Sequence, residues 1–174
     1  MEENMIIREL KAVAELDWLN EEQASYYRER AERAYPVQCV PMAEVFTPEQ
    51  MSFIRMHYRA RRNGCWQNAS RLVDLICCNP LYFHEKAKYI EGFVRSAGLL
   101  AIDHAFVRVG DKYIDPTFER ALRLDVRKED YVALREFSFR EKNELQWESG
   151  YYGELYLFDW AKKQKERQKN RPRH

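Results

Sequence analysis

One cysteine of the chain lies at the start of a predicted helix, a position that can make a thiol reactive. Cys65 follows the helix-breaking pair Asn63-Gly64 and opens a segment whose apolar residues recur at helical spacing. Free backbone N–H groups and the positive end of the helix dipole gather at a helix start, and both favour a thiolate over a thiol. The N–H groups of Cys65 and Trp66 would also face a developing oxyanion. This position makes Cys65 a candidate nucleophile, although cysteine is also a common buried residue that only packs.

A histidine and an aspartate come together in a hairpin further along the chain. Two alternating segments, 103–109 and 112–117, flank a Gly-Asp pair, which is a strong signal for a two-residue turn. This register puts His104 and Asp115 on one face as diagonal neighbours, at roughly 7–8 Å between backbones. An aspartate that accepts a proton from one imidazole nitrogen leaves the other nitrogen free as a base. A His–Asp pair that only helps the sheet to fold fits the same pattern.

The residues around these three positions resemble the transglutaminase-like superfamily of papain-like cysteine enzymes. In that superfamily a cysteine opens a helix, a histidine followed by alanine and an aromatic residue lies on one strand, and Asp-Pro-Thr lies on the next. The resemblance covers about residues 60–120, roughly a third of the chain. It rests on Gly64-Cys65-Trp66-Gln67-Asn68-Ala69, Tyr89-Ile90-Glu91-Gly92, His104-Ala105-Phe106 and Asp115-Pro116-Thr117.

The resemblance implies an α+β fold with a papain-like core, in which the nucleophile helix packs on an antiparallel sheet. The apolar periodicity before residue 35 adds an N-terminal helix to this core. The resemblance also implies that Cys65 is the nucleophile, His104 the general base and acid, and Asp115 the residue that orients His104. We expect a thiol-dependent acyl-transfer enzyme, either a cysteine peptidase, a deamidase or a transglutaminase-like transferase. Its substrate would be a peptide, a protein or a small amide, and we expect no cofactor and no metal.

The three residues that directly follow Cys65 are candidates for substrate binding. Trp66 would wall the acyl pocket and exclude water, although a tryptophan at a helix start is often a packing residue. Gln67 and Asn68 would contact the substrate or cap neighbouring backbone.

Two further candidates lie outside this helix. Papain-like enzymes place a glutamine several residues before the cysteine as an oxyanion donor, but residues 58–63 contain no glutamine. That role would fall to Asn63 or to the backbone. Glu91 precedes a glycine on the strand before His104, where it would either point into the cleft or remain a solvated strand carboxylate.

Two alternatives to an acyl-transfer hydrolase stay open. Residues 61–68 loosely resemble arylamine N-acetyltransferases, which also use Cys-His-Asp and take the acyl group from coenzyme A. The chain is short for that family. The other alternative is a catalytically inactive papain-like scaffold that is retained for binding.

Hydrophobic periodicity and capping residues predict the elements that would position these residues. A helical segment spans about 4–34, with a break near Asn20. The next helix begins at Thr47 and runs to about Arg61, and the one after it runs from Cys65 to about Cys78. The remaining expected elements are a strand at 89–95, the hairpin, a helix at 138–148 and a last strand at 154–158.

Length, composition and charge limit the classes of protein to which this chain can belong. The chain has 174 residues, of which 45% are hydrophobic, and a formal net charge of +1, which fits a globular domain and gives no argument for a polyanionic partner. No apolar run approaches the ~18 residues that span a membrane, and the N-terminus lacks a signal-peptide core, so we expect a cytoplasmic protein. The four cysteines lack the paired spacing of a zinc site, and we expect them to be reduced.

The charge is concentrated at the C-terminal end. Residues 162–174 carry seven Lys or Arg against one Glu, whereas residues 1–161 form the expected single domain. A solvated, frayed helix and tail explains this run best. An arm that binds nucleic acid or an acidic partner is the alternative. The run has no aromatic residue on which bases could stack, which counts against single-strand binding.

Overall fold

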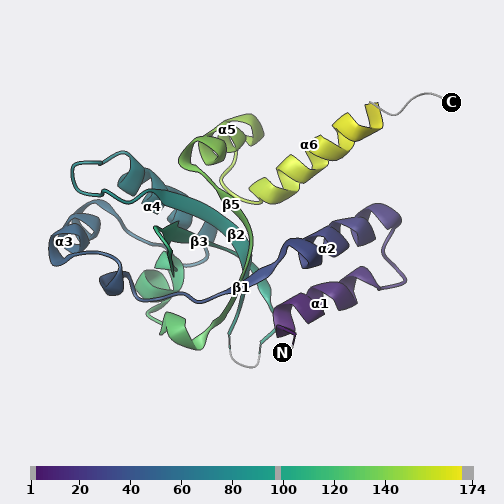
Figure 1. Ribbon diagram of the computed structural model, residues 1–174, viewed down its shortest axis with the longest axis horizontal. Helices are drawn as coiled ribbons and strands as arrows, with labels where there is room; N and C mark the ends of the chain where they lie inside the picture. Colours follow the sequence, from purple (N-terminus) through teal and green to yellow (C-terminus); the bar gives the residue numbers. More distant parts are fainter. Residues whose placement is uncertain (1–2, 97–98, 170–174) are drawn as a thin grey trace.

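The computed structural model describes residues 3–96 and 99–169. The fold is α+β, as expected: six α-helices accompany a curled five-stranded sheet in the described residues (Figure 1). The helices are α1 (Met5–Ala14), α2 (Glu21–Arg33), α3 (Pro48–His57), α4 (Cys65–Cys77), α5 (Phe139–Ser149) and α6 (Leu155–Lys169). The strands are β1 (Tyr35–Val37), β2 (Ala87–Arg95), β3 (Ile102–Val109), β4 (Lys112–Ile114) and β5 (Asp130–Phe137).

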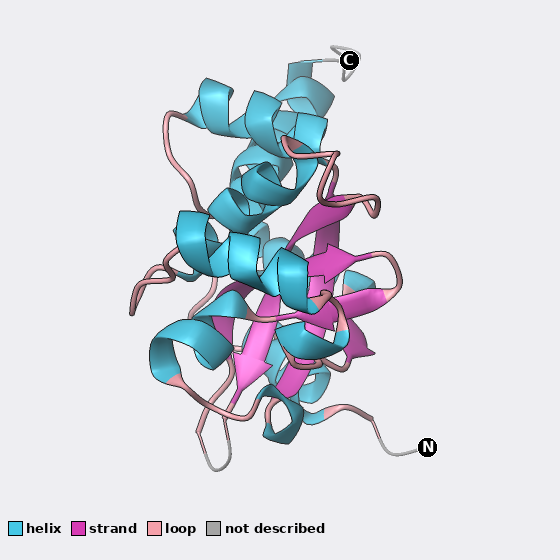
Figure 2. Cartoon of the chain, turned by 90° about the vertical axis from the view of Figure 1, so that its left-hand side faces the viewer, coloured by secondary structure: helices cyan, strands magenta, loops and turns pink. Residues whose placement is uncertain are grey.

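The strands lie in the order β1-β5-β2-β3-β4, and every neighbouring pair is antiparallel. Figure 2 shows helices gathered along one side of this sheet. The expected strand at 89–95 and the expected hairpin are confirmed as β2 and as the pair β3–β4. Among the described residues, no helix combines the length and apolar character needed to cross a membrane.

Helix starts follow the capping signals of the sequence. Asn20, Thr47 and Ser138 each accept a hydrogen bond from the backbone three residues on, and each forms a reciprocal capping box. The break near Asn20 is confirmed, because Asn20 caps α2 after α1 has ended. Helix α3 ends at His57, four residues before the expected end at about Arg61.

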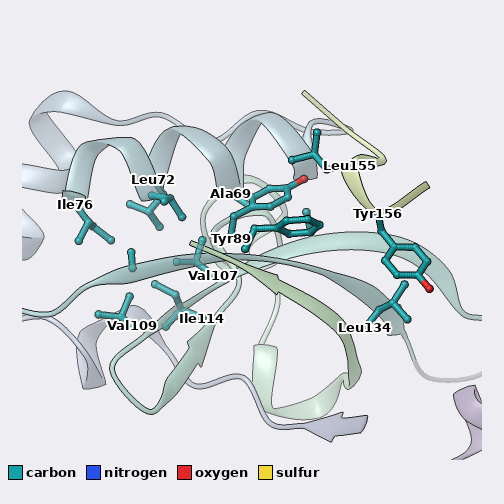
Figure 3. Packing of buried hydrophobic residues seen from close by; sticks show 14 of the residues in the cluster. Ala69, Leu72, Ile76, Tyr89, Val107, Val109, Ile114, Leu134, Leu155 and Tyr156 are labelled. Carbon is teal, nitrogen blue, oxygen red and sulfur yellow. The ribbon is translucent and has the colours of Figure 1, made fainter. Parts of the chain in front are cut away.

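Helix α4 packs along β2 and β3 and forms the main core with them (Figure 3). Its buried face includes Leu72 and Ile76, which lie over the side chains of Val107, Val109 and Ile114. Burial of each such side chain stabilises the fold by roughly 1.5–3 kcal/mol. A helix that opens with the candidate nucleophile is thereby fixed on an antiparallel sheet.

The opposite face of the sheet carries a second, smaller apolar cluster. It is built from alternate strand residues that include Ile90, Phe106 and Tyr131, and from Phe118 of the segment after β4. Ala105 and Val107 belong to the first cluster and Phe106 to the second. The two-face alternation expected for this hairpin is confirmed.

The expected strand at 154–158 is wrong. Leu155 begins α6, which runs to Lys169, because the buried carboxylate of Glu91 accepts the free N–H groups at its start. Local sequence cannot reveal a cap that lies some sixty residues away. Residues 162–169 of the expected tail belong to this helix, and residues 170–174 lie outside the described residues.

Candidate active site

His104 and Asp115 form the buried half of the candidate site. Val109 pairs with Lys112 and Val107 with Ile114, as the two-residue turn requires, so the predicted register is confirmed. His104 Nε2 lies 2.7 Å from an Asp115 carboxylate oxygen. The His104 side chain is 3% exposed and that of Asp115 is fully buried. Water is therefore excluded from this pair, and the bond between the two side chains is stronger than it would be in solvent.

Asp115 is held by three groups besides His104. Its Oδ1 accepts hydrogen bonds from the backbone N–H groups of Thr117 and Phe118, at 2.8 and 3.1 Å. Its Oδ2, the oxygen that contacts His104, also accepts from the Tyr131 hydroxyl at 2.9 Å. Four hydrogen bonds fix the carboxylate in a position from which it can orient the imidazole of His104.

Tyr131 is a site residue that sequence reasoning missed. It lies on β5, a strand that was not predicted, and its side chain reaches across the sheet to Asp115. Burial and the negative charge of Asp115 raise the pKa of Tyr131 far above its usual value, so its hydroxyl remains a donor at every physiological pH. The only signal in the sequence was a tyrosine among apolar residues in segment 131–134.

Cys65 occupies the first position of α4, as expected. The preceding N-cap residue is Gly64, which has no side chain to cap the first turn, so the N–H groups there stay available to a ligand. The thiol is half-buried. It lies close enough to His104 to contribute to the raised pKa of that imidazole. Since Nε2 faces Asp115, Nδ1 is the imidazole nitrogen left for the sulfur.

The surroundings of His104 favour the imidazolium. Burial alone would lower the pKa of His104, but the negative charge of Asp115, its hydrogen bond and the contribution of Cys65 together raise the pKa to about 10. His104 is therefore protonated at neutral pH. The arrangement places an imidazolium next to Cys65.

Asn68 connects the two halves of the site. Its Nδ2 donates to Thr117 Oγ1 at 3.0 Å and to the Arg61 carbonyl at 2.7 Å, while its Oδ1 accepts from the Arg61 N–H at 2.9 Å. The Tyr58 hydroxyl donates to the Asn68 carbonyl. Asn68 is 2% exposed and its amide is fully used. It braces the start of α4 against the Asp115 loop and has no free group for a substrate.

Glu91 is buried and supports the neighbouring helix. Its carboxylate accepts the N–H groups of Leu155 and Tyr156, both at 2.8 Å, and the Tyr89 hydroxyl at 3.0 Å. Burial raises the pKa of Glu91, although these three donors oppose the shift. Of the two roles expected for Glu91, a solvated strand carboxylate is wrong, because the residue is 5% exposed and borders a cavity.

Two cavities meet at Trp66. The first, of about 180 Å³, is bordered by Trp66, His104 and residues of α2 and α6. The second, of about 270 Å³, is bordered by Asn63 and Gln67 together with the 151–154 loop. A Cβ on Gly153 would lie 2.4 Å from the Trp66 ring, so this loop rests directly on the indole. Trp66 thus walls the cavity that reaches His104, whereas Asn63 and Gln67 face the other one.

Comparisons of this chain with protein-family models, with curated proteins and with solved structures found no match. Within the residues that the structure describes, no group of three or more His, Cys, Asp or Glu side chains is placed to hold a metal ion. The candidate site is thus defined by its own geometry, which brings Cys65, His104 and Asp115 together with Trp66 and Tyr131.

Proposed function

We propose that the protein is a thiol-dependent acyl-transfer enzyme whose triad is Cys65, His104 and Asp115 on a papain-like or transglutaminase-like core. The carrying observation is the buried His104–Asp115 pair, in which Asp115 binds one nitrogen of His104 at 2.7 Å. Cys65, at the start of α4, lies close enough to contribute to the raised pKa of the same imidazole. Nucleophile, base and orienting group are the three parts that this chemistry needs.

In the proposed reaction, the Cys65 thiolate attacks the carbonyl carbon of an amide or ester. The carbonyl oxygen takes up negative charge, which the N–H groups at the start of α4 stabilise. The imidazolium of His104 gives its proton to the leaving amine or alcohol as the C–N or C–O bond breaks, and a thioester remains on Cys65.

A second nucleophile completes the cycle. Water or an amine transfers a proton to neutral His104 and attacks the thioester carbon. The S–C bond then breaks, and the thiolate returns. Water gives hydrolysis, or deamidation when the acyl group is a side-chain amide, whereas an amine gives transamidation. Asp115 holds the imidazole in place throughout.

Trapping the acyl-enzyme tests this proposal. The protein is incubated with p-nitrophenyl acetate or with acetyl-coenzyme A, and the acetylated residue is located by peptide mass spectrometry. We expect acetyl transfer to Cys65 from the ester, with loss of the adduct in Cys65→Ala and a sharp reduction in His104→Ala. Cys78→Ala, which removes an exposed thiol, is the matched control.

The outcomes separate the alternatives. An adduct that persists in Cys65→Ala contradicts the proposal. Preferential transfer from acetyl-coenzyme A would favour the N-acyltransferase alternative. If Cys65 reacts no faster than Cys78 with either donor, an inactive binding scaffold is favoured. The 3% exposure of His104 is also consistent with such a scaffold.

A further inference from the structure

The cavity that reaches His104 has a charged wall on its far side. It lies between α2, the sheet and the start of α6, and its volume of about 180 Å³ admits a small polar group. The residues that matter for its chemistry are Arg30, Trp66, Glu91, Asp103, His104 and Tyr156. His104 and Trp66 belong to the candidate active site, so a ligand in this cavity would contact the candidate general base and the residue that follows Cys65.

Arg30 is fixed in this wall by aromatic rings. The residue is 6% exposed although it lies on α2, outside the sheet. Its guanidinium carbon lies 4.4 Å from the ring centroid of Phe93 and 5.0 Å from that of Tyr26. Such packing holds the cation in one place, so a ligand that binds it need not order a flexible side chain.

The hydrogen-bonding capacity of Arg30 is largely unused. A guanidinium has five N–H donors, yet within the described residues the one acceptor found for this side chain is a carboxylate oxygen of Asp103. Its Nε is buried without a hydrogen-bond partner. A buried, unpartnered donor is costly unless a ligand or water satisfies it, and unused cationic donors favour an anion.

The acidic groups of the cavity are already engaged or lie at its edge. Glu91 accepts three hydrogen bonds from the protein, and Asp103, which is more than half exposed, pairs with Arg30 from the solvent side. Glu154 is exposed at the rim. Apart from His104, Arg30 is the one cation among the described residues that border this cavity. A carboxylate could therefore use the donors that Asp103 leaves free.

We propose that Arg30 is the anchor for a carboxylate of the substrate, so that the enzyme acts on small amides or esters that carry a carboxylate near the reacting carbonyl. This inference rests on the proposed function of Cys65. Arg30 would bind the carboxylate through charge-assisted hydrogen bonds, while the reacting carbonyl lies between the start of α4 and His104. The anchor selects the substrate by charge and takes no part in bond making.

Two alkylating reagents of similar size test this inference. Iodoacetate carries a carboxylate and iodoacetamide is neutral, and each transfers its carbon to a thiolate with loss of iodide. The rate constants at Cys65 are measured by peptide mass spectrometry, with exposed Cys78 as the reference thiol in the same chain. The measured quantity is the iodoacetate-to-iodoacetamide ratio at Cys65, divided by that at Cys78.

Three variants separate the contribution of Arg30 to this ratio from that of His104, which also attracts the anion. Arg30→Gln should lower the ratio about fivefold, because the cation is lost. Asp103→Asn should raise it about twofold, because the competing carboxylate is removed. Arg28→Gln, an exposed change on the same helix, should leave the ratio unchanged.

Each outcome decides a separate point. An unchanged ratio in Arg30→Gln, or a lowered ratio in Asp103→Asn, overturns the anchor, and Asp103→Asn alone decides if Arg30→Gln does not fold. Slow labelling of Cys65 by both reagents in the unmodified protein would instead count against the proposed function. In that case the change in ratio still reports whether Arg30 places a positive charge beside Cys65.

Discussion

The candidate site contains one buried carboxylate, that of Asp115, and a second, that of Glu91, lies beside it. The two have different roles. Asp115 and Glu91 each accept hydrogen bonds from backbone N–H groups and from a tyrosine hydroxyl. Only Asp115 also binds His104. Glu91 instead satisfies the first turn of α6. The same chemical group thus orients an imidazole in one place and caps a helix in the other.

The comparison separates chemistry from support. A carboxylate bonded to a titratable ring controls the protonation of that ring, whereas a carboxylate bonded to backbone N–H groups controls the position of a helix. Changes at Asp115 should therefore alter thiol reactivity. Changes at Glu91 should alter stability and leave the reactivity of Cys65 nearly intact.

The largest effect is expected for Asp115→Asn. An amide cannot stabilise the imidazolium of His104 and favours the wrong tautomer, so acylation of Cys65 by p-nitrophenyl acetate should slow by about a thousandfold or more. Release of p-nitrophenol in stopped-flow measurements gives the rate. Glu91→Gln is the matched control and should stay within about threefold of the unmodified protein. Similar slowing in both variants would mean that the two carboxylates do not differ in role.

Glu91→Gln should have its main effect on stability. The new side-chain amide keeps one acceptor oxygen and presents a donor in place of the other, so one of the two N–H groups of Leu155 and Tyr156 is left buried and unpaired. The free energy of unfolding should fall by about 2–3 kcal/mol. Urea unfolding followed by circular dichroism measures the change. Glu154→Gln, an exposed carboxylate next to α6, should change stability by less than about 0.5 kcal/mol.

Tyr131 donates to Asp115 and Tyr89 donates to Glu91, so these two tyrosines form a matched pair. Tyr131→Phe and Tyr89→Phe each delete one hydroxyl donor to a buried carboxylate, and each should lower the free energy of unfolding by about 1–1.5 kcal/mol. Only Tyr131→Phe should also slow acylation of Cys65, by about tenfold, because it loosens the carboxylate that orients His104. Equal rates in the two variants would remove Tyr131 from the site.

A further expected effect is a pH dependence of stability that comes from His104. Its pKa in the folded protein is raised to about 10, from about 6.5 in the unfolded chain. The stabilisation is therefore fully present below about pH 6.5 and is lost as the pH rises through about 10. The free energy of unfolding should fall over this range more steeply in the unmodified protein than in His104→Gln. Parallel curves would contradict the raised pKa.

The parts of the site that local sequence rules encode were predictable. The Gly-Asp turn determines the register of its own hairpin, so it predicted the pairing of His104 with Asp115. The Asn63-Gly64 pair predicted that α4 begins at Cys65, because glycine interrupts a helical pattern.

The parts that depend on distant contacts were not predictable. Tyr131 reaches Asp115 only because β5 lies beside β2, and Glu91 caps α6 only because the chain returns to β2 after α5. The role of Asn68 as a brace requires Thr117 from a segment almost fifty residues later. Nor does the sequence of α2 indicate that Arg30 borders a cavity beside His104, since that depends on how α2 packs on the sheet.

The central claim is that His104 and Asp115 activate Cys65, and the competition among the four thiols tests it most directly. The protein is treated with limiting iodoacetamide near neutral pH, and the label on Cys39, Cys65, Cys77 and Cys78 is measured by peptide mass spectrometry. An ordinary exposed thiol is only a few per cent thiolate at this pH. We predict that Cys65 is labelled first, ahead of the more exposed Cys78, and that Asp115→Asn abolishes this lead. Labelling of Cys78 first, or slow and equal labelling of all four, would contradict the account.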